Sequence, residues 1–179
     1  MNIEFELPLV EEILASFSRP IGRDLLAYRN HVYRVIHLCY ASGDFSIEDR
    51  HKIQIAACFH DIGIWTAGTL DYLPPSAHEA TRYLLVIGKP SWIPEVVEMI
   101  EMHHGIRSRK GSPYPLTEAF RRADIADFSL GRVRMGLPRE LIAELKEAFP
   151  NAGFHWRLMM LGSRWLIKHP RKPLPMFRL

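Results

Sequence analysis

Histidine and aspartate are the residue types in this chain whose positions suggest shared chemistry. The sequence has nine histidines and two cysteines, Cys39 and Cys58. Two cysteines cannot form a disulfide framework or a cysteine-rich zinc site. A metal site in this chain would therefore use imidazole and carboxylate ligands rather than thiolates, and metal binding is the first hypothesis to test.

The His60-Asp61 pair is the most informative unit. It follows residues 53–59, which are mostly apolar and look buried. A buried, charged aspartate is costly unless it is paired or bound to a metal. One imidazole and one carboxylate at the end of a buried helix can meet the same cation.

Other polar residues lie where helical periodicity predicts burial. His31, His103 and Asp124 are each four residues from an apolar residue on the same helical face. His78 falls near the start of its predicted helix. A single inward histidine is more often a hydrogen-bonded core residue, and a lone buried aspartate is usually a cap or part of a pair. The prediction of a site therefore depends on the whole ordered set.

Helical periodicity dominates the chain, while strand and hairpin signals are weak, so the sequence predicts an all-α fold. The length of 179 residues fits one domain. Ser46 with Asp49 and Ser76 with Glu79 resemble capping boxes that open two of the helices. Residues 62–75 and 105–116 are rich in glycine and proline and are expected to be loops. Helices are expected near residues 10–17, 23–41, 46–60, 76–87, 94–103, 117–130, 139–149 and 155–168.

Composition points to a globular protein without a membrane partner. Apolar residues make up 47% and charged residues 24% of the chain, which is ordinary for a soluble domain. No apolar run approaches the roughly 18 residues that span a bilayer. The acidic N-terminus lacks the basic region of a signal peptide, so we expect a cytoplasmic protein. The oligomeric state is left open.

The last part of the chain is basic. Residues 148–179 carry six basic and no acidic side chains. We expect this segment to be a helix with a solvated basic face, and we do not expect nucleic acid among the partners. Strong salt-dependent retention on DNA would be needed to revive that alternative.

The order of these polar residues resembles that of the HD-domain superfamily of metal-dependent phosphohydrolases. The matching residues are His31, His60-Asp61, His78, His103-His104 and Asp124. The resemblance covers about residues 25–130 and implies a single HD-type helical bundle, with a basic helical extension over residues 138–179. It implies that one metal is held by His31, His60, Asp61 and Asp124. Asp61, the catalytic carboxylate, would bridge to a second metal held by His78 and His103.

The resemblance also implies the reaction. One or two divalent transition metal ions (Fe, Mn, Co, Ni or Zn) suit imidazole and carboxylate ligands. They would activate water for attack on a phosphate ester or anhydride of a small nucleotide-like or phosphorylated metabolite. Two roles are open for His104: it could replace His103 as a metal ligand, or it could contact the substrate. The expected substrate contacts are His104, Arg34, Arg107, Arg109 and Lys110.

Two departures from the family pattern bear on the substrate. Ile64 stands where many relatives have a lysine, which suggests an altered or less charged substrate. Gly105 replaces a glutamate of the cyclic-di-GMP hydrolases, so that activity is not favoured. The same six ligands would also serve a di-iron oxygenase that cleaves a C–C or C–P bond. A non-enzymatic, metal-stabilised module is a third alternative, against which the complete ligand set argues.

Overall fold

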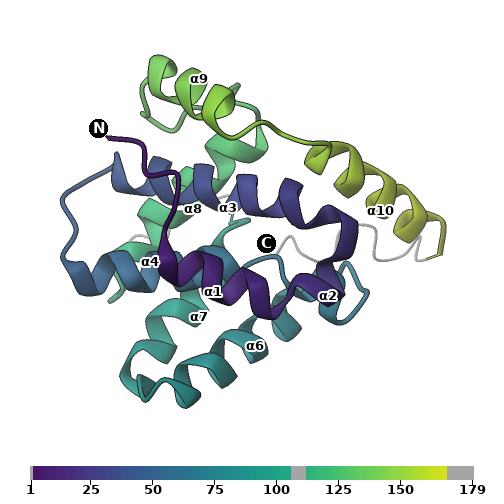
Figure 1. The fold of residues 1–179 in the computed structure, drawn as a ribbon, viewed down its shortest axis with the longest axis horizontal. Coiled ribbons are helices and arrows are strands. Elements are labelled where there is room, and N and C mark those ends of the chain that lie inside the picture. The colour runs from purple at the N-terminus through teal and green to yellow at the C-terminus, as the bar shows by residue number, and fades with distance from the viewer. Residues whose placement is uncertain (1, 106–111, 169–179) are drawn as a thin grey trace.

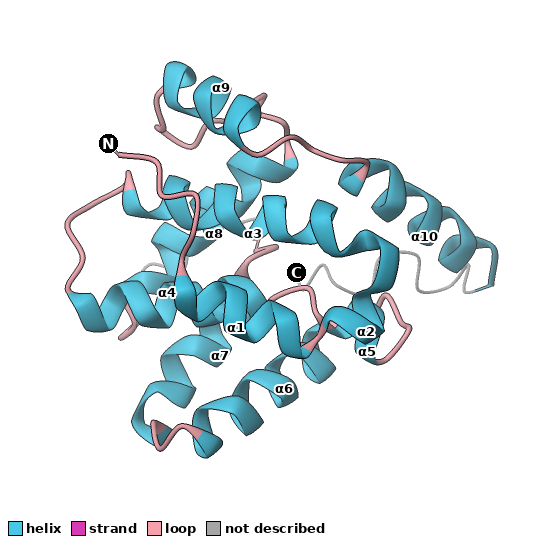
Figure 2. Cartoon of the chain, viewed as in Figure 1, coloured by secondary structure: helices cyan, strands magenta, loops and turns pink. Residues whose placement is uncertain are grey.

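The computed structural model describes residues 2–105 and 112–168. All regular structure within these ranges is helical, as Figure 2 shows by the absence of any magenta ribbon. The prediction of an all-α fold is confirmed for this part of the chain. No helix in these ranges is both long enough and apolar enough to cross a membrane.

The helices follow one another with short connections. In chain order they are α1 (Pro8–Ser16), α2 (Ser18–Ile21), η1 (Gly22–Asp24, a 3-10 helix), α3 (Leu25–Tyr40), α4 (Ile47–Phe59), α5 (Gly63–Thr66), α6 (Leu73–Val86), η2 (Pro90–Trp92, a 3-10 helix), α7 (Ile93–Met102), α8 (Leu116–Phe128), α9 (Arg139–Ala148) and α10 (Phe154–Lys168).

α3 is the central helix of the fold. It packs against α4, α8 and α9, and α10 also contacts it (Figure 1). Every residue from 27 to 40 except Arg29 is buried. A helix that is buried all round carries its polar side chains into the interior, where each needs a partner. His31 is one of these residues.

The two predicted capping boxes have different outcomes. The Ser46–Asp49 box is present at the start of α4: the Asp49 amide donates to Ser46 Oγ over 3.1 Å. The Ser76–Glu79 box is wrong, because α6 begins three residues earlier, at Leu73. Its first turn contains prolines. A proline suits the start of a helix because the N–H group that it lacks would have no acceptor within the helix there. Ser76 Oγ instead accepts the amide of Gly63 over 2.9 Å.

Gly63 sets the spacing between the His60-Asp61 turn and α6. It begins α5, a short helix inside a segment predicted to be a loop. A Cβ at Gly63 would lie 2.4 Å from the carbonyl oxygen of Tyr72, a distance that no side chain can accommodate. The glycine therefore lets the backbone of residues 60–63 approach Tyr72 and Ser76 closely.

Candidate metal centre

Polar side chains from α3, α8 and the end of α4 meet in the interior. His31 Nε2 lies 2.9 Å from His60 Nε2. It also lies 3.8 Å from Asp61 Oδ2 and 3.5 Å from Asp124 Oδ1. His60 Nε2 is 3.4 Å and 3.6 Å from the same two oxygens. The structure therefore brings together all four residues that were predicted to hold the first metal.

The imidazole rings are oriented by their Nδ1 atoms. His60 Nδ1 lies 2.8 Å from the carbonyl oxygen of Ala57, and His103 Nδ1 lies 2.6 Å from that of Ile100. A carbonyl oxygen only accepts hydrogen bonds, so each Nδ1 carries the proton. His31 Nδ1 likewise donates to Asp127 Oδ2 over 2.7 Å. With Nδ1 occupied in this way, the Nε2 atom of each ring faces the cluster, where it can hold a proton or bind a metal ion.

The Nε2 atoms of His31 and His60 lie 2.9 Å apart. Without a metal ion, one of these two atoms carries a proton and donates it to the lone pair of the other ring. Two nitrogens at about 2.0–2.1 Å from one ion would lie roughly 2.9–3.4 Å apart, depending on the angle between them. The observed separation is therefore compatible with a shared proton and with a shared metal ion.

Unpartnered buried atoms give a second indication. Three buried side-chain atoms in the described ranges have no hydrogen-bond partner, and two of them, Asp61 Oδ1 and His103 Nε2, lie here. They face each other across 3.5 Å. An unsatisfied buried polar group costs about 1–3 kcal/mol, so two such atoms side by side call for a bound group. The residues present fit a metal ion.

Two overlapping groups of ligand atoms result. His31, His60 and Asp61 form one, and Asp61, His103 and His104 form the other. Asp61 is common to both, as expected of a bridging carboxylate. The second group contains both His103 and His104, so the structure does not choose between them as the ligand, and it allows a third arrangement in which both bind. Tyr72, which sequence reasoning missed, hydrogen-bonds through its hydroxyl to His104 Nε2.

The electrostatics of the cluster favour a cation. Burial lowers the pKa of His60, but Asp61 and Asp124 act more strongly and raise it to about 9. Burial raises the pKa of the Asp61 carboxyl, yet His60 and His103 hold it well below its usual range. Burial and His103 together lower the pKa of His104 to about 3, so this ring is neutral at neutral pH. A proton and a metal ion compete for the same negative cluster.

Arg34 is buried and paired inside the protein. The predicted phosphate contact is 2% exposed, and its guanidinium donates to both carboxylate oxygens of Asp127 and to the carbonyl oxygen of Phe149. Asp127 in turn accepts from His31 Nδ1. Arg34 therefore fixes the carboxylate that orients a ligand ring. Burial raises the pKa of Asp127, but His31 and Arg34 hold it well below its usual value.

His78 lies away from the cluster. It is exposed on α6 and belongs to neither group of ligand atoms. The buried residues of that helix include Ala77, Ala80 and Leu84, and His78 points to another side. The remaining predicted substrate contacts, Arg107, Arg109 and Lys110, lie outside the described residues.

A cavity of about 260 Å³ lies over the cluster. His31, Asp61 and Asp124 line its floor together with His104 and Tyr72. Its other lining residues come from α8, α10 and the segment before α6: Leu70, Phe128, His155, Leu158, Met159 and Gly162.

Sequence reasoning missed the contribution of α10. Phe154 stacks on the ring of His31, with centroids 4.3 Å apart and planes at 19°. His155 Nε2 bonds the carbonyl oxygen of Phe128 over 2.9 Å, which ties α10 to α8. The last helix was expected to begin near residue 155, one residue after Phe154. No local pattern indicates that Phe154 covers the ring of His31.

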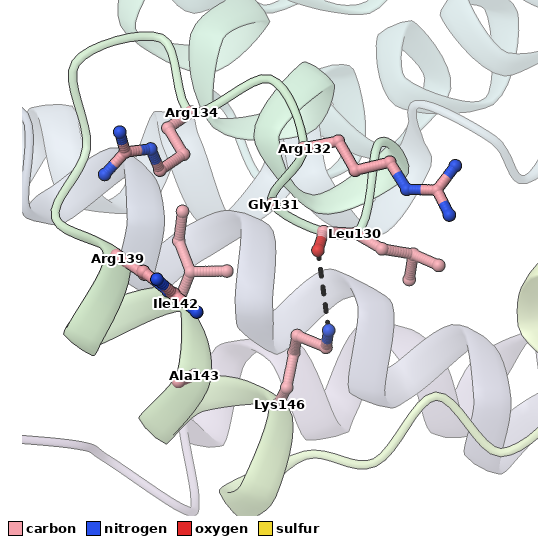
Figure 3. Close-up of a pocket in the computed structure, with 8 residues that line it drawn as sticks. All are labelled: Leu130, Gly131, Arg132, Arg134, Arg139, Ile142, Ala143 and Lys146. Atoms are coloured by element: carbon pink, nitrogen blue, oxygen red, sulfur yellow. Dashed lines mark hydrogen bonds between the residues drawn. The ribbon is translucent and has the colours of Figure 1, made fainter.

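A second hollow lies between the end of α8 and α9 (Figure 3). It is wider, about 530 Å³, and is lined by four basic residues. Lys146 donates to the carbonyl oxygen of Leu130 over 3.4 Å. Arg132, Arg134 and Arg139 are exposed and form no ion pair with a described residue. This hollow contains no metal-ligand residue types.

Comparisons of the chain with protein-family models, curated proteins and solved structures found no match. The case for a function therefore depends on the site itself.

Proposed function

We propose that the protein is a metal-dependent phosphohydrolase of the HD type, acting on a small phosphorylated metabolite. One observation carries the proposal: imidazole nitrogens and carboxylates converge beside a cavity, and two of their buried atoms, Asp61 Oδ1 and His103 Nε2, have no hydrogen-bond partner. The order of these residues along the chain, which resembles the HD superfamily, supports the same reaction.

The residues of the site would have different roles. His31, His60, Asp61 and Asp124 would hold one ion; Asp61, His103 and His104 would hold a second. When bound, such ions neutralise charge on phosphoryl oxygens and lower the pKa of coordinated water. Arg34 holds the Asp127 carboxylate, and that carboxylate accepts the hydrogen bond from His31 Nδ1. Asp127 therefore keeps the ring of His31 in its orientation, with the proton at Nδ1. Phe154 excludes water from the far face of that ring.

Metal content and turnover test the proposal together. Protein purified without added metal would be analysed for bound elements. It would then be loaded with Mn²⁺, Co²⁺, Ni²⁺, Zn²⁺ or Fe²⁺. Release of phosphate from phosphomonoesters, and of nucleotide products from cyclic nucleotides and dinucleoside polyphosphates, would be measured. We expect at least one ion per chain and turnover of at least one phosphomonoester. Confirmed loading without hydrolysis of any of these compounds would reject the hydrolase.

A di-iron oxygenase is the second candidate, and one observation favours it. No lysine or arginine is among the described residues that line the cavity, although a phosphorylated substrate would use one. Purification with two equivalents of iron, substrate-dependent oxygen consumption and a mixed-valent electron paramagnetic resonance signal would select this reaction. Their absence in iron-loaded protein would leave hydrolysis.

A further inference from the structure

The cavity over the candidate metal centre is lined by two chemically distinct sets of residues. His31, Asp61 and Asp124 are polar and almost completely buried, so they lie on its inner side. The second set is four large apolar side chains: Leu70, Phe128, Leu158 and Met159. A molecule that filled this space would meet both metal-ligand residue types and hydrocarbon.

Two of the wall residues are open to solvent. Phe128 is 44% and Met159 is 55% exposed, although both are large and apolar. Single exposed apolar residues are ordinary, but these two line one cavity beside buried ligand atoms. A bound apolar group would remove part of their surface from water, at about 25 cal/mol per Å².

The volume limits the occupant. A protein cavity of about 150 Å³ accepts benzene. The 260 Å³ cavity has roughly 110 Å³ more, which leaves space for a small head group beside one ring. Ligand pockets for larger molecules are usually about 300–1,000 Å³. A base, a sugar and a chain of phosphates would not fit together here.

Charge points the same way. The cavity lining contains no lysine or arginine within the described ranges. A polyphosphate would bring several negative charges to these walls, where a single phosphoryl head could be neutralised at the floor alone. A molecule with one compact anionic group and one apolar group would match both sets of lining residues.

We propose that α10 and Phe128 form an apolar subsite, and that the substrate joins one phosphate group to a single aryl or branched alkyl group. The phosphate head rests on the proposed function; the apolar subsite rests on the cavity walls. The chain thus selects small organic phosphates over nucleotides and polyphosphates.

Gly162 offers a way to fill the subsite. It lies on α10 and lines the cavity, and a Cβ built there has no heavy atom within 4 Å. Gly162→Leu therefore adds volume to the cavity without a clash at Cβ, and leucine favours a helix more than glycine does. Ser163→Leu is the matched control, because it adds the same side chain at the next, exposed position of α10.

The test measures binding of phenylphosphonate and methylphosphonate, which have the same head and are not hydrolysed. Calorimetry on protein with confirmed metal content is expected to give a Kd at least about tenfold lower for phenylphosphonate. Gly162→Leu should reduce this ratio about fivefold or more by filling the space, whereas Ser163→Leu should retain the ratio of the unaltered protein. Each variant is analysed for metal so that equally loaded proteins are compared.

The outcomes separate this inference from the proposed function. Equal affinities for the two phosphonates, or an unchanged ratio in Gly162→Leu, would overturn the apolar subsite even if the protein hydrolysed phosphomonoesters. A strong preference for phenylphosphonate that Gly162→Leu removes would support the subsite even if no phosphate were released. Preferential hydrolysis of benzyl phosphate, whose alcohol leaving group resembles that of methyl phosphate in acidity, over both methyl phosphate and ATP would support both.

Discussion

The candidate metal centre and the basic hollow are two concave regions of the described part of the chain, and they are built in opposite ways. The hollow between α8 and α9 is about twice as large, at 530 against 260 Å³, and carries four cations. Its arginines are exposed to water. Beside the smaller cavity, the candidate ligands are buried. The rings of His31, His60 and His103 each donate a hydrogen bond from Nδ1 to an oxygen of the protein.

Burial explains why the smaller region is the better functional candidate. Charges near water interact through a high dielectric, so exposed arginines gain little from any one neighbour. In the interior the same interactions are stronger, and an atom without a partner is costly. Unpartnered buried atoms therefore mark a binding site more reliably than the size or charge of a hollow does.

Removing the shared carboxylate should produce the largest difference between the two regions. Asp61→Ala removes the residue common to both ligand groups. We expect loss of most bound metal and more than about a 100-fold loss of activity, because even residues behind the ligands are worth 10–100-fold. Elemental analysis and turnover measure this, with circular dichroism to confirm helicity. Asp71→Ala, an exposed aspartate, is the control; undiminished metal in Asp61→Ala would reject the site.

Weakening the support of one ligand ring should have a smaller effect. Asp127→Asn keeps the shape of the side chain but removes the charge that meets His31 and Arg34. Metal affinity is expected to fall about 10–100-fold, as measured by competition with a chelating dye. An affinity within twofold of the unaltered protein would show that Asp127 does not orient His31 as a ligand.

The pH dependence of stability distinguishes proton from metal in the cluster. Because Asp61 and Asp124 raise the pKa of His60 to about 9 in the folded protein, its protonation stabilises the metal-free fold. That contribution is fully present below pH 6.5 and is lost as pH rises from about 6.5 to 9. Urea unfolding of chelator-treated protein should show this decline. Metal-loaded protein should not, because a bound ion requires the neutral ring.

Substitutions in the basic hollow should have the smallest effects. Arg139→Gln and Arg134→Gln remove exposed cations that form no ion pair with a described residue. The free energy of unfolding is expected to change by less than about 0.5 kcal/mol, with no change in metal content. Urea unfolding and elemental analysis check both values. A loss of metal in either arginine variant would contradict the conclusion that the basic hollow and the candidate metal centre are independent.

Helical periodicity was sufficient to predict most of the helices and to mark several polar residues as buried. The grouping of His31, His60, Asp61 and Asp124 around one metal came from the family resemblance, and the structure brings these four residues together. His78 was also assigned as a ligand from its place in the family order, and the structure places it outside the cluster. The spacing of Ala77, Ala80 and Leu84 already marks a buried face that excludes it.

Tertiary packing decided what local patterns could not. Arg34 lies one turn from His31, as expected, but only the position of α8 shows that it meets Asp127 rather than a substrate. Part of the cavity wall comes from α10, far along the chain from His60 and Asp61. Sequence periodicity predicts which side of a helix is buried and does not predict which residue it will cover.

The hydrogen bonds from His60 and His103 to carbonyl oxygens three residues earlier have a consequence for the thermodynamics of binding. Immobilising a flexible side chain at a binding site opposes association by about 0.5–1.5 kcal/mol. These rings are already fixed by the last turns of α4 and α7. Their rotational entropy is lost when the chain folds, so the capture of an ion requires little further ordering.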